Sequence, residues 1–203
     1  MALHKTFISY HHANEQDLKN EIIETLGGEY FIDKSVGDGD IDPNNTDETI
    51  MNTIRRDFLK DSTVTLVLVG SETSQRPFIN SELQASLWGS NPNGLLCVVR
   101  DDLYSSLYTS STCSFGTSIR TRSPEWTTLI PELVRVNHIA DNSNCHFNDS
   151  EVYCSISSYS SFMKNPTHYI EQAFNKRSNA DTLIKQKKLS PDTPKIERVK
   201  KSL

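Results

Sequence analysis

The feature that most constrains the fold is a nearly unbroken apolar run, Val64–Val69, rich in β-branched residues and ending at Gly70. A strand that is apolar on both faces is typical of the centre of a parallel sheet, because helices cover both sides of such a sheet. A polar turn follows, and residues 78–88 then read as an amphipathic helix with Glu82 near its start. Since ligands of open α/β sheets bind beyond the carboxyl ends of the strands, we expect any chemistry here.

Strand and helix signals alternate from residue 6 to residue 99. Short apolar runs predict strands over 6–10, 30–32 and 95–99, in addition to the central one. Apolar residues at helical spacing predict three helices, with stripes at Leu18, Ile22 and Leu26, at Ile50, Ile54 and Phe58, and at Ile79, Leu83 and Leu87. Such alternation predicts right-handed βαβ units and a mainly parallel sheet.

The pattern weakens after Arg100. The Ser- and Thr-rich stretch Tyr104–Arg122 shows no clear period and reads as a long loop with at most short helical turns. Both Pro131–Ile139 and Glu151–Ile156 could form the last strand, and the second is favoured. Pro166–Phe174 reads as a closing helix, and Thr182–Leu189 could form another helix beyond it.

The sign of the charge changes at the end of this predicted closing helix. From Asn175 onward, nine basic and three acidic residues give a charge of +6. Because the whole chain has a net charge of −5, residues 1–174 carry −11. We therefore expect one domain over 1–174, with an irregular insertion at 100–150, and a basic C-terminal tail over 175–203. The tail is expected to be a solvated, mobile end, although it could contact an acidic partner or the body. The acidic body argues against general nucleic-acid binding.

Composition also narrows the setting in which the protein acts. No stretch approaches the roughly 18 apolar residues that a membrane span needs, and the first residues do not resemble a secretory signal. The four cysteines form no C-x-x-C pair, which indicates neither a disulfide framework nor a zinc site. We therefore expect a cytoplasmic protein without a membrane partner, a metal or a bound cofactor.

Five polar side chains besides Glu82 are candidates for ligand contacts. Ser9, Tyr10 and His11 leave the carboxyl end of the first strand, and Asp33 ends the second. Ser71 lies in the turn after the third strand, where it could contact a phosphate or adenine. Three of them have a structural alternative: Asp33 could order the loop that follows it, Ser71 could cap a helix, and His11 could be solvated or cap the next helix.

The opening Phe7-Ile8-Ser9-Tyr10, its acidic helix and the Ser81-Glu82-Leu83 helix after a buried strand resemble the TIR family. More narrowly, the chain resembles the TIR-like ThsB proteins of bacterial Thoeris anti-phage systems over roughly residues 4–100. The resemblance implies a flavodoxin-like fold with about five strands. It also implies cleavage of NAD⁺ as substrate, with Glu82 as the catalytic carboxylate and the end of the first strand lining the nucleotide pocket.

The resemblance further implies a product and a partner. Nicotinamide would be released, and a cyclic ADP-ribose isomer or an ADP-ribose conjugate would activate an effector protein as a diffusible signal. In TIR domains the connection at Val36–Asn45 often mediates self-assembly or gates the pocket. Without this resemblance, Glu82 would read as an ordinary carboxylate near a helix N-terminus.

Two other functions remain open from the sequence. The chain could be a non-catalytic TIR-like interaction module that uses the Val36–Asn45 loop and the basic tail. It could also be a nucleoside-processing transferase of similar architecture that places a carboxylate near ribose. Release of nicotinamide from NAD⁺ separates the enzymatic hypothesis from both.

Overall fold

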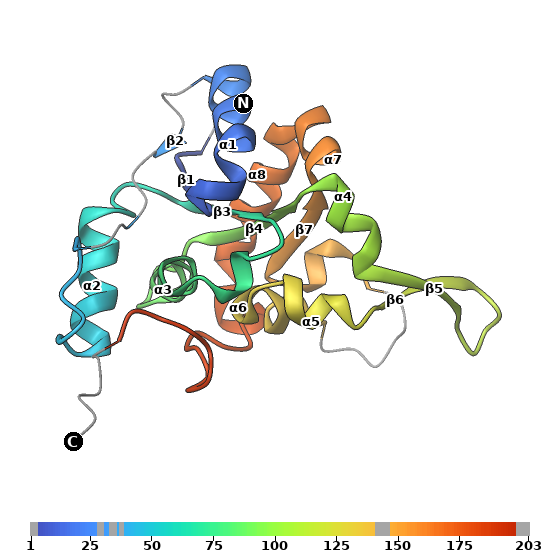
Figure 1. Cartoon of the computed structure of the whole chain (residues 1–203). Coiled ribbons are helices and arrows are strands. Elements are labelled where there is room, and N and C mark those ends of the chain that lie inside the picture. The colour runs from blue at the N-terminus through green and yellow to red at the C-terminus, as the bar shows by residue number, and fades with distance from the viewer. Residues whose placement is uncertain (1–3, 28–30, 33–35, 37–38, 141–146, 198–203) are drawn as a thin grey trace.

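The computed structural model describes residues 4–27, 31–32, 36, 39–140 and 147–197, which form three layers (Figure 1). The central sheet of this described part has five parallel strands in the order β2-β1-β3-β4-β7. Their bounds are β1 Thr6–Ser9, β2 Phe31–Ile32, β3 Val64–Val69, β4 Gly94–Val99 and β7 Cys154–Ser158. The expected flavodoxin-like fold with a mainly parallel sheet is confirmed.

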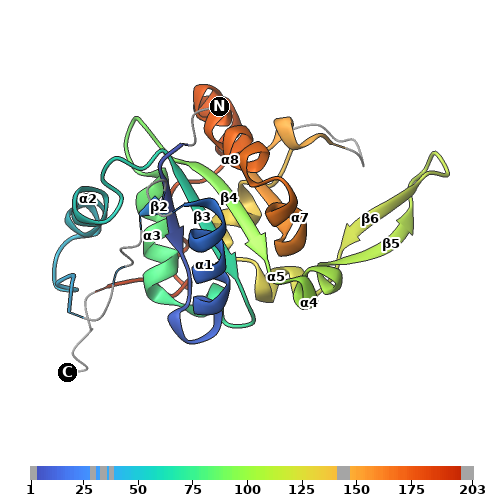
Figure 2. The same cartoon turned by 90° about the horizontal axis from the view of Figure 1, so that it is seen from above.

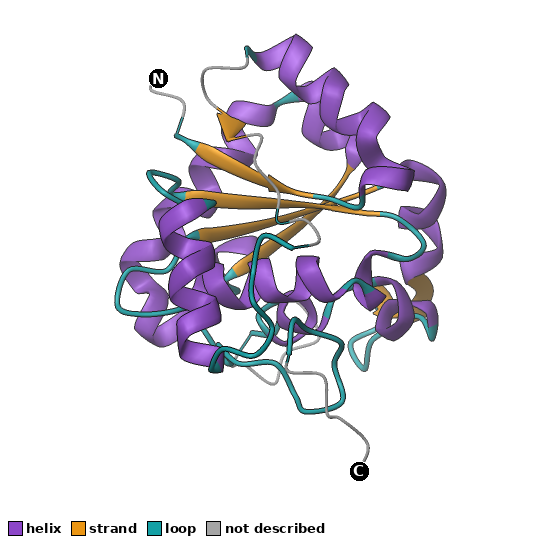
Figure 3. Ribbon diagram, turned by 60° about the vertical axis from the view of Figure 1, so that its left-hand side comes forward, coloured by secondary structure: helices purple, strands orange, loops and turns teal. Residues whose placement is uncertain are grey.

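Helices cover both faces of this sheet (Figure 3). The α-helices of the described part are α1 His12–Leu26, α2 Asp47–Asp57, α3 Pro77–Leu87, α4 Asp101–Tyr104, α5 Glu125–Leu129, α6 Glu132–Val136, α7 Tyr159–Lys164, α8 Pro166–Asn175 and α9 Ala180–Leu183. Its 3₁₀ turns are Thr73–Gln75, Ser105–Leu107, Asp149–Glu151 and Lys176–Asn179. Thr46 caps α2 by accepting a hydrogen bond from the Thr49 N–H, as expected for that residue type. No helix in the described ranges has the length and hydropathy needed to span a membrane.

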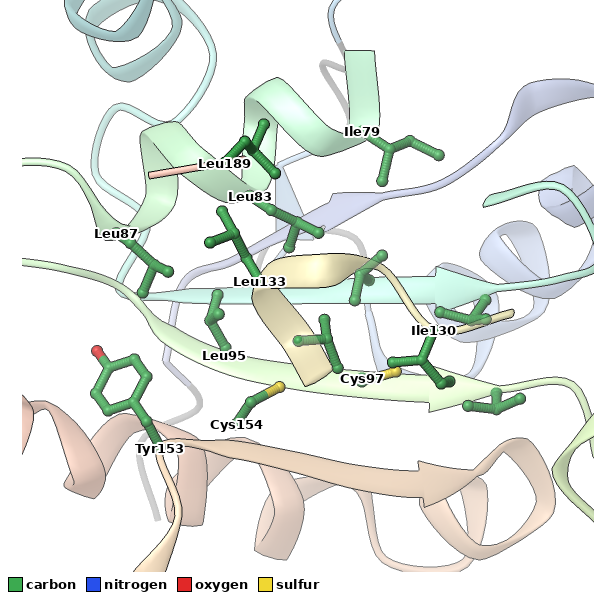
Figure 4. Close-up of a cluster of buried hydrophobic side chains, with 14 of the residues drawn as sticks. Ile79, Leu83, Leu87, Leu95, Cys97, Ile130, Leu133, Tyr153, Cys154 and Leu189 are labelled. Carbon is green, nitrogen blue, oxygen red and sulfur yellow. The ribbon is translucent and has the colours of Figure 1, made fainter. Parts of the chain in front are cut away.

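The central strand explains why the sequence there is apolar without interruption. Val67 and Val69 point toward α3, α5 and α6, whereas Leu66 and Leu68 point toward α1, α7 and α8. The cluster on the side of α3 also contains side chains of β4 and β7, and Leu189 from near the C-terminal end of the described chain (Figure 4). Both faces of β3 are therefore dry, which is the condition that the run of β-branched residues predicts.

Two expectations for residues 100–140 are wrong. Tyr104–Arg122 is not a loop, because β5 Tyr108–Thr112 and β6 Ser118–Arg122 pair as an antiparallel hairpin. Pro131–Ile139 contains the helix α6 rather than a strand, whereas the preferred last strand, β7, is confirmed. The hairpin lacks apolar alternation because most of its residues are exposed, so no core-facing pattern marks it in the sequence.

The expectation of a solvated tail is wrong for residues 184–197. This C-terminal segment lies along α3 and α6, where Leu189 and Ile196 are buried. The preceding helix α9 ends at Leu183, so most of the helix expected over 182–189 is absent. The tail residues 198–203 lie outside the described residues, and the domain boundary at 174/175 stays a prediction.

Polar side chains of α3 and α6 hold this C-terminal segment by its backbone. The side chains of Gln84 and Ser81 accept hydrogen bonds from the N–H groups of Leu189 and Ile196, at 2.8 and 2.9 Å. The Glu132 carboxylate accepts hydrogen bonds from the N–H and hydroxyl of Ser190. As a result, every residue from Ile79 to Leu87 is buried, on both faces of the helix.

Gly94 is expected to tolerate no side chain. A Cβ atom on Gly94 would lie 2.0 Å from the backbone oxygen of Ala173 in α8, which cannot move aside as a flexible side chain could. Gly94→Ala should therefore lower the free energy of unfolding by about 3 kcal/mol, measured by urea denaturation. Gly39→Ala is the matched control. Its Cβ would have no neighbour within 4 Å, and only its positive φ should cost about 1 kcal/mol.

Candidate functional site

The candidate site lies where the strand order reverses. β1 and β3 are neighbours in the sheet, but the chain runs from β1 outward to β2 before it returns to β3. The connections that leave their carboxyl ends therefore diverge and open a crevice at this point. Three segments meet there: residues 10–12 after β1, Val36 after β2, and residues 76–82, which begin α3.

Glu82 lies at the floor of this crevice. Its side chain is 1% exposed, and each carboxylate oxygen accepts one hydrogen bond. The Ser9 hydroxyl donates to Oε2 at 2.6 Å, and the Val36 backbone N–H donates to Oε1 at 2.8 Å. Burial raises the pKa of Glu82 to about 7, and these two hydrogen bonds limit the rise. Half of the Glu82 carboxyl groups are thus ionised near neutral pH.

A cavity of about 240 Å³ opens above Glu82. One wall comes from the start of α3, and the opposite wall comes from the residues that follow β1. Its lining residues are Tyr10, His11, His12, Val36, Arg76, Pro77, Phe78, Ile79 and Glu82. The cavity is thus mostly apolar, with one carboxylate and a few nitrogen-bearing side chains, which is the usual composition of a small-molecule site.

The nitrogen-bearing side chains gather on the side of His11 and Arg76. The Arg76 guanidinium forms an ion pair with the exposed Glu72, whose Oε2 lies 3.9 Å from His11 Nδ1. Burial lowers the pKa of His11, and the positive charge of Arg76 lowers it further. His11 is therefore mainly neutral at pH 7.

The structure brings three of the predicted residues to Glu82 or its cavity. Ser9 is fully buried and contacts Glu82 itself, so it orients the carboxylate from beneath. His11 lines the cavity. Tyr10 also lines it, but its ring is 4% exposed and stacks on His12 with centroids 4.5 Å apart. That ring belongs to the core cluster beside α1, so stacking on a ligand would require it to turn.

The other two predicted residues are not placed at this cavity. Ser71 is exposed and lines a separate hollow with Glu15 and Arg100, on the other side of the β3–α3 connection. Asp33 lies outside the described residues. The roles assigned to these side chains from the sequence stay predictions.

Six lining residues were not among the site residues predicted from the sequence: His12, Val36, Arg76, Pro77, Phe78 and Ile79. Val36 contributes a backbone N–H, which no side-chain pattern can indicate. Arg76 immediately precedes Pro77, and a proline in the first helical turn does mark the start of α3. A basic residue at that boundary, beyond the carboxyl end of a central strand, was the available signal. Phe78 lies four residues before Glu82, one turn away on the same helix face.

The arrangement suits stabilisation of positive charge in a small ligand. Each Glu82 oxygen accepts one protein hydrogen bond and keeps a second lone pair, so the carboxylate can still accept donors from a ligand. Surrounding apolar atoms exclude water and strengthen any charge interaction inside the cavity. A cation formed next to Glu82 would therefore be stabilised, provided that the carboxyl group is ionised.

Comparison with known proteins gives one match. Residues 7–104 match the sequence profile of the family described as Thoeris protein ThsB, TIR-like domain. The matched range runs from β1 through α4 and contains all the residues that line the cavity. Searches of curated proteins and of solved structures found no match.

Proposed function

Residues 7–104 belong to the TIR-like domain family of the Thoeris protein ThsB, and we propose that this protein cleaves NAD⁺ in anti-phage defence. The proposal rests on one observation: a single buried carboxylate, Glu82, lines a cavity at the crevice between β1 and β3. Its pKa of about 7 allows it to be ionised under physiological conditions without a metal or another charged partner.

The proposed reaction needs a carboxylate at this place. The bond between the nicotinamide nitrogen and ribose C1′ breaks, and its electron pair leaves with neutral nicotinamide. Positive charge then develops on the ribose, as in glycoside hydrolysis. Glu82 would stabilise this charge and accept hydrogen bonds from ribose hydroxyls, while Ser9 and Val36 hold its two oxygens in place.

The size of the cavity suits one half of the substrate. A volume of about 240 Å³ is less than a whole dinucleotide needs, so the nicotinamide ribose would enter and the rest would extend outward. Arg76, His11 and His12 would then lie toward the diphosphate, to which they offer positive charge or N–H donors. Phe78 and Ile79 provide apolar contact for the nicotinamide ring.

The nucleophile determines the product. An adenine nitrogen or a ribose hydroxyl of the same molecule would close a cyclic ADP-ribose isomer, whereas an outside acceptor would give a conjugate and water would give ADP-ribose. As its bond to C1′ forms, the molecule that carries the nucleophile releases one proton to solvent, from the hydroxyl, the water or the adenine amino group. We propose a cyclic isomer or a conjugate, which would act as a diffusible signal on a partner effector protein.

The test is to incubate the full-length protein with NAD⁺ and follow nicotinamide by chromatography, in buffer and in lysate of phage-infected cells. The lysate supplies any trigger that the pure protein lacks. We expect nicotinamide together with a nucleotide product. Turnover of a nucleoside while NAD⁺ is untouched would favour a transferase instead. Protection from phage without NAD⁺ consumption in infected cells would favour an interaction module.

The pH dependence should follow the ionisation of Glu82. Only the carboxylate form stabilises the ribose cation, so kcat/KM should fall about tenfold per pH unit below the pKa of about 7. It should level off above pH 7.5. Initial rates of nicotinamide release between pH 5 and 9 give this profile. A flat profile between pH 5 and 7 would contradict ionisation of Glu82 in this range.

A further inference from the structure

The hairpin β5–β6 projects from the body beyond the part of the chain that matches the family (Figures 1 and 2). Its base is fixed to the body by aromatic contacts. Tyr108 lies 5.6 Å from Trp126 between ring centroids, and the Arg122 guanidinium lies 4.7 Å above the Trp126 ring. Beyond this base, within the described residues, the two strands pair only with each other. An isolated two-stranded hairpin is marginally stable in water, so such a projection is expected to have a partner.

The free edge of β5 is suited to pairing with another strand. The Cys113 N–H bonds to Thr117 and the Ser123 N–H bonds to Leu107, which fixes the alternation of the ladder. By that alternation, Thr109 and Ser111 bond to β6, whereas the backbone groups of Tyr108, Ser110 and Thr112 point away from it. This outer edge has no charged residue and no proline, the usual features that prevent strand addition.

The tip of the hairpin exposes an aromatic side chain. Phe115 is 87% exposed, about twice as much as the exposed Ile139 at 42%. A hollow of about 310 Å³ lies at the base of the same hairpin, lined by Tyr104, Ser105, Tyr108, Thr109, Ser110 and Arg120. Its aromatic rings and its guanidinium group are suitable neighbours for a phenyl ring.

We propose that two copies of this chain associate through their β5 edges, forming a four-stranded antiparallel sheet around a two-fold axis at Ser110. Tyr108 of each copy then faces Thr112 of the other. Phe115, three residues beyond Thr112, comes level with Ser105 of the second copy, at that copy's hollow. Tip and hollow are thus exchanged symmetrically, which is the property of an isologous interface.

The charges favour a second copy as the occupant. Residues 104–122 carry two arginines and no acidic residue, so the hairpin is +2 and the rest of the chain is −7. In the proposed pair the positively charged hairpin of each copy lies against the acidic other copy, and its uncharged tip approaches the exposed Asp101 and Asp102 there. Pairing through β5 also keeps Arg120 and Arg122 on the outer strands, away from their symmetry mates.

Proline substitutions on the two edges test this proposal. Ser110→Pro removes the N–H at the centre of the β5 edge but no bond of the hairpin, because that N–H points away from β6. Ser118→Pro is the matched control, since Ser118 pairs with Thr112 and its N–H points away from β5, on the opposite edge. Phe115→Ser removes the apolar tip. The dissociation constant of the full-length protein is measured by sedimentation velocity over a concentration series.

We expect a monomer–dimer equilibrium for the wild type and for Ser118→Pro. Ser110→Pro and Phe115→Ser should each weaken dimerisation by about tenfold or more, because each change acts twice in a symmetric interface. Circular dichroism and the thermal midpoint identify any variant that misfolds. A wild type that stays monomeric throughout the series would overturn the proposal. So would equal weakening by Ser110→Pro and Ser118→Pro in folded proteins.

Discussion

Glu82→Gln is expected to lower the rate of nicotinamide release from NAD⁺ by on the order of 10²–10³, the usual loss for one preorganised electrostatic contact. Glutamine has nearly the same shape as glutamate. Its amide oxygen can accept the hydrogen bond from Val36, and its amide nitrogen can donate to Ser9, so the cavity should keep its form. What is lost is the negative charge beside the ribose.

Glu132→Gln is the matched control for this rate. Glu132 is also a buried helical glutamate that accepts several hydrogen bonds, but it contacts the C-terminal segment and does not line the cavity. This control should keep a rate close to that of the wild type. Both variants should be assayed in lysate of infected cells as well as in buffer. Equal rates for Glu82→Gln and the wild type would reject the assignment of the catalytic residue.

The second large effect is expected in stability, and it requires no trigger. The folded pKa of Glu82 is about 7 and its ordinary value is 4.5, so the folded state holds a proton that the unfolded state has already lost between these pH values. Wild-type stability therefore falls as pH rises through this window. Glutamine does not titrate, so the free energy of unfolding of Glu82→Gln minus that of the wild type should increase by about 3 kcal/mol from pH 4 to pH 8.

Glu132→Gln should show the opposite sign. Burial alone would raise the pKa of Glu132, but hydrogen bonds from Ser190, Thr193 and Gln186 outweigh it and lower the pKa. A lowered carboxyl pKa contributes stability above the ordinary value, and this contribution is lost as pH falls. Glu132→Gln should therefore be most destabilising near neutral pH. Urea denaturation of the three proteins at several pH values measures both trends, and parallel curves for all three would contradict the electrostatics described for Glu82.

The sequence predicts the core of this fold because burial acts directly on the residue pattern. The β3 run is apolar on both sides because the sheet is covered on both faces, and the stripes of α2 and α3 become buried. In α1 only Ile22 of the stripe is buried, whereas Leu18 and Leu26 are partly buried. The Thr46 cap and the helix start at Pro77 are local features that depend on a few neighbouring residues. Such features can be predicted without knowledge of the rest of the chain.

The hairpin and the C-terminal segment depend on interactions that leave little trace in local sequence. The hairpin is mostly exposed on both sides, so Ser, Thr and Arg satisfy it without any alternation. The C-terminal segment is charged and poor in apolar residues. It is held by Gln84, Ser81 and Glu132, which are more than fifty residues away along the chain. Hydrogen bonds to its backbone replace the apolar periodicity on which sequence reasoning depends.

The sequence predicted the position of Glu82 better than it predicted which protein groups contact its carboxylate. The sequence predicts Glu82 near the start of the helix that follows the central strand, where any chemistry is expected, and the side chain does line a cavity there. Its partners differ in kind from the expectation. Ser9 contacts the carboxylate beneath the cavity, and the second donor is the backbone N–H of Val36. Contacts between two protein groups inside a site are set by tertiary geometry, which strand and helix patterns do not encode.

If the Glu82 carboxylate faces the nicotinamide ribose as proposed, a titration of that one group will show it. The ¹³C signal of the Glu82 carboxyl carbon, assigned by comparison with Glu82→Gln, is followed against pH with and without a carbocyclic NAD⁺ analogue that cannot be cleaved. We expect a pKa of about 7 for Glu82 in the free protein. Binding of the positively charged pyridinium ring should lower that pKa by about one unit or more. A pKa that does not change when the analogue is bound, or an analogue that does not bind, would contradict the placement of Glu82 beside the nicotinamide ribose.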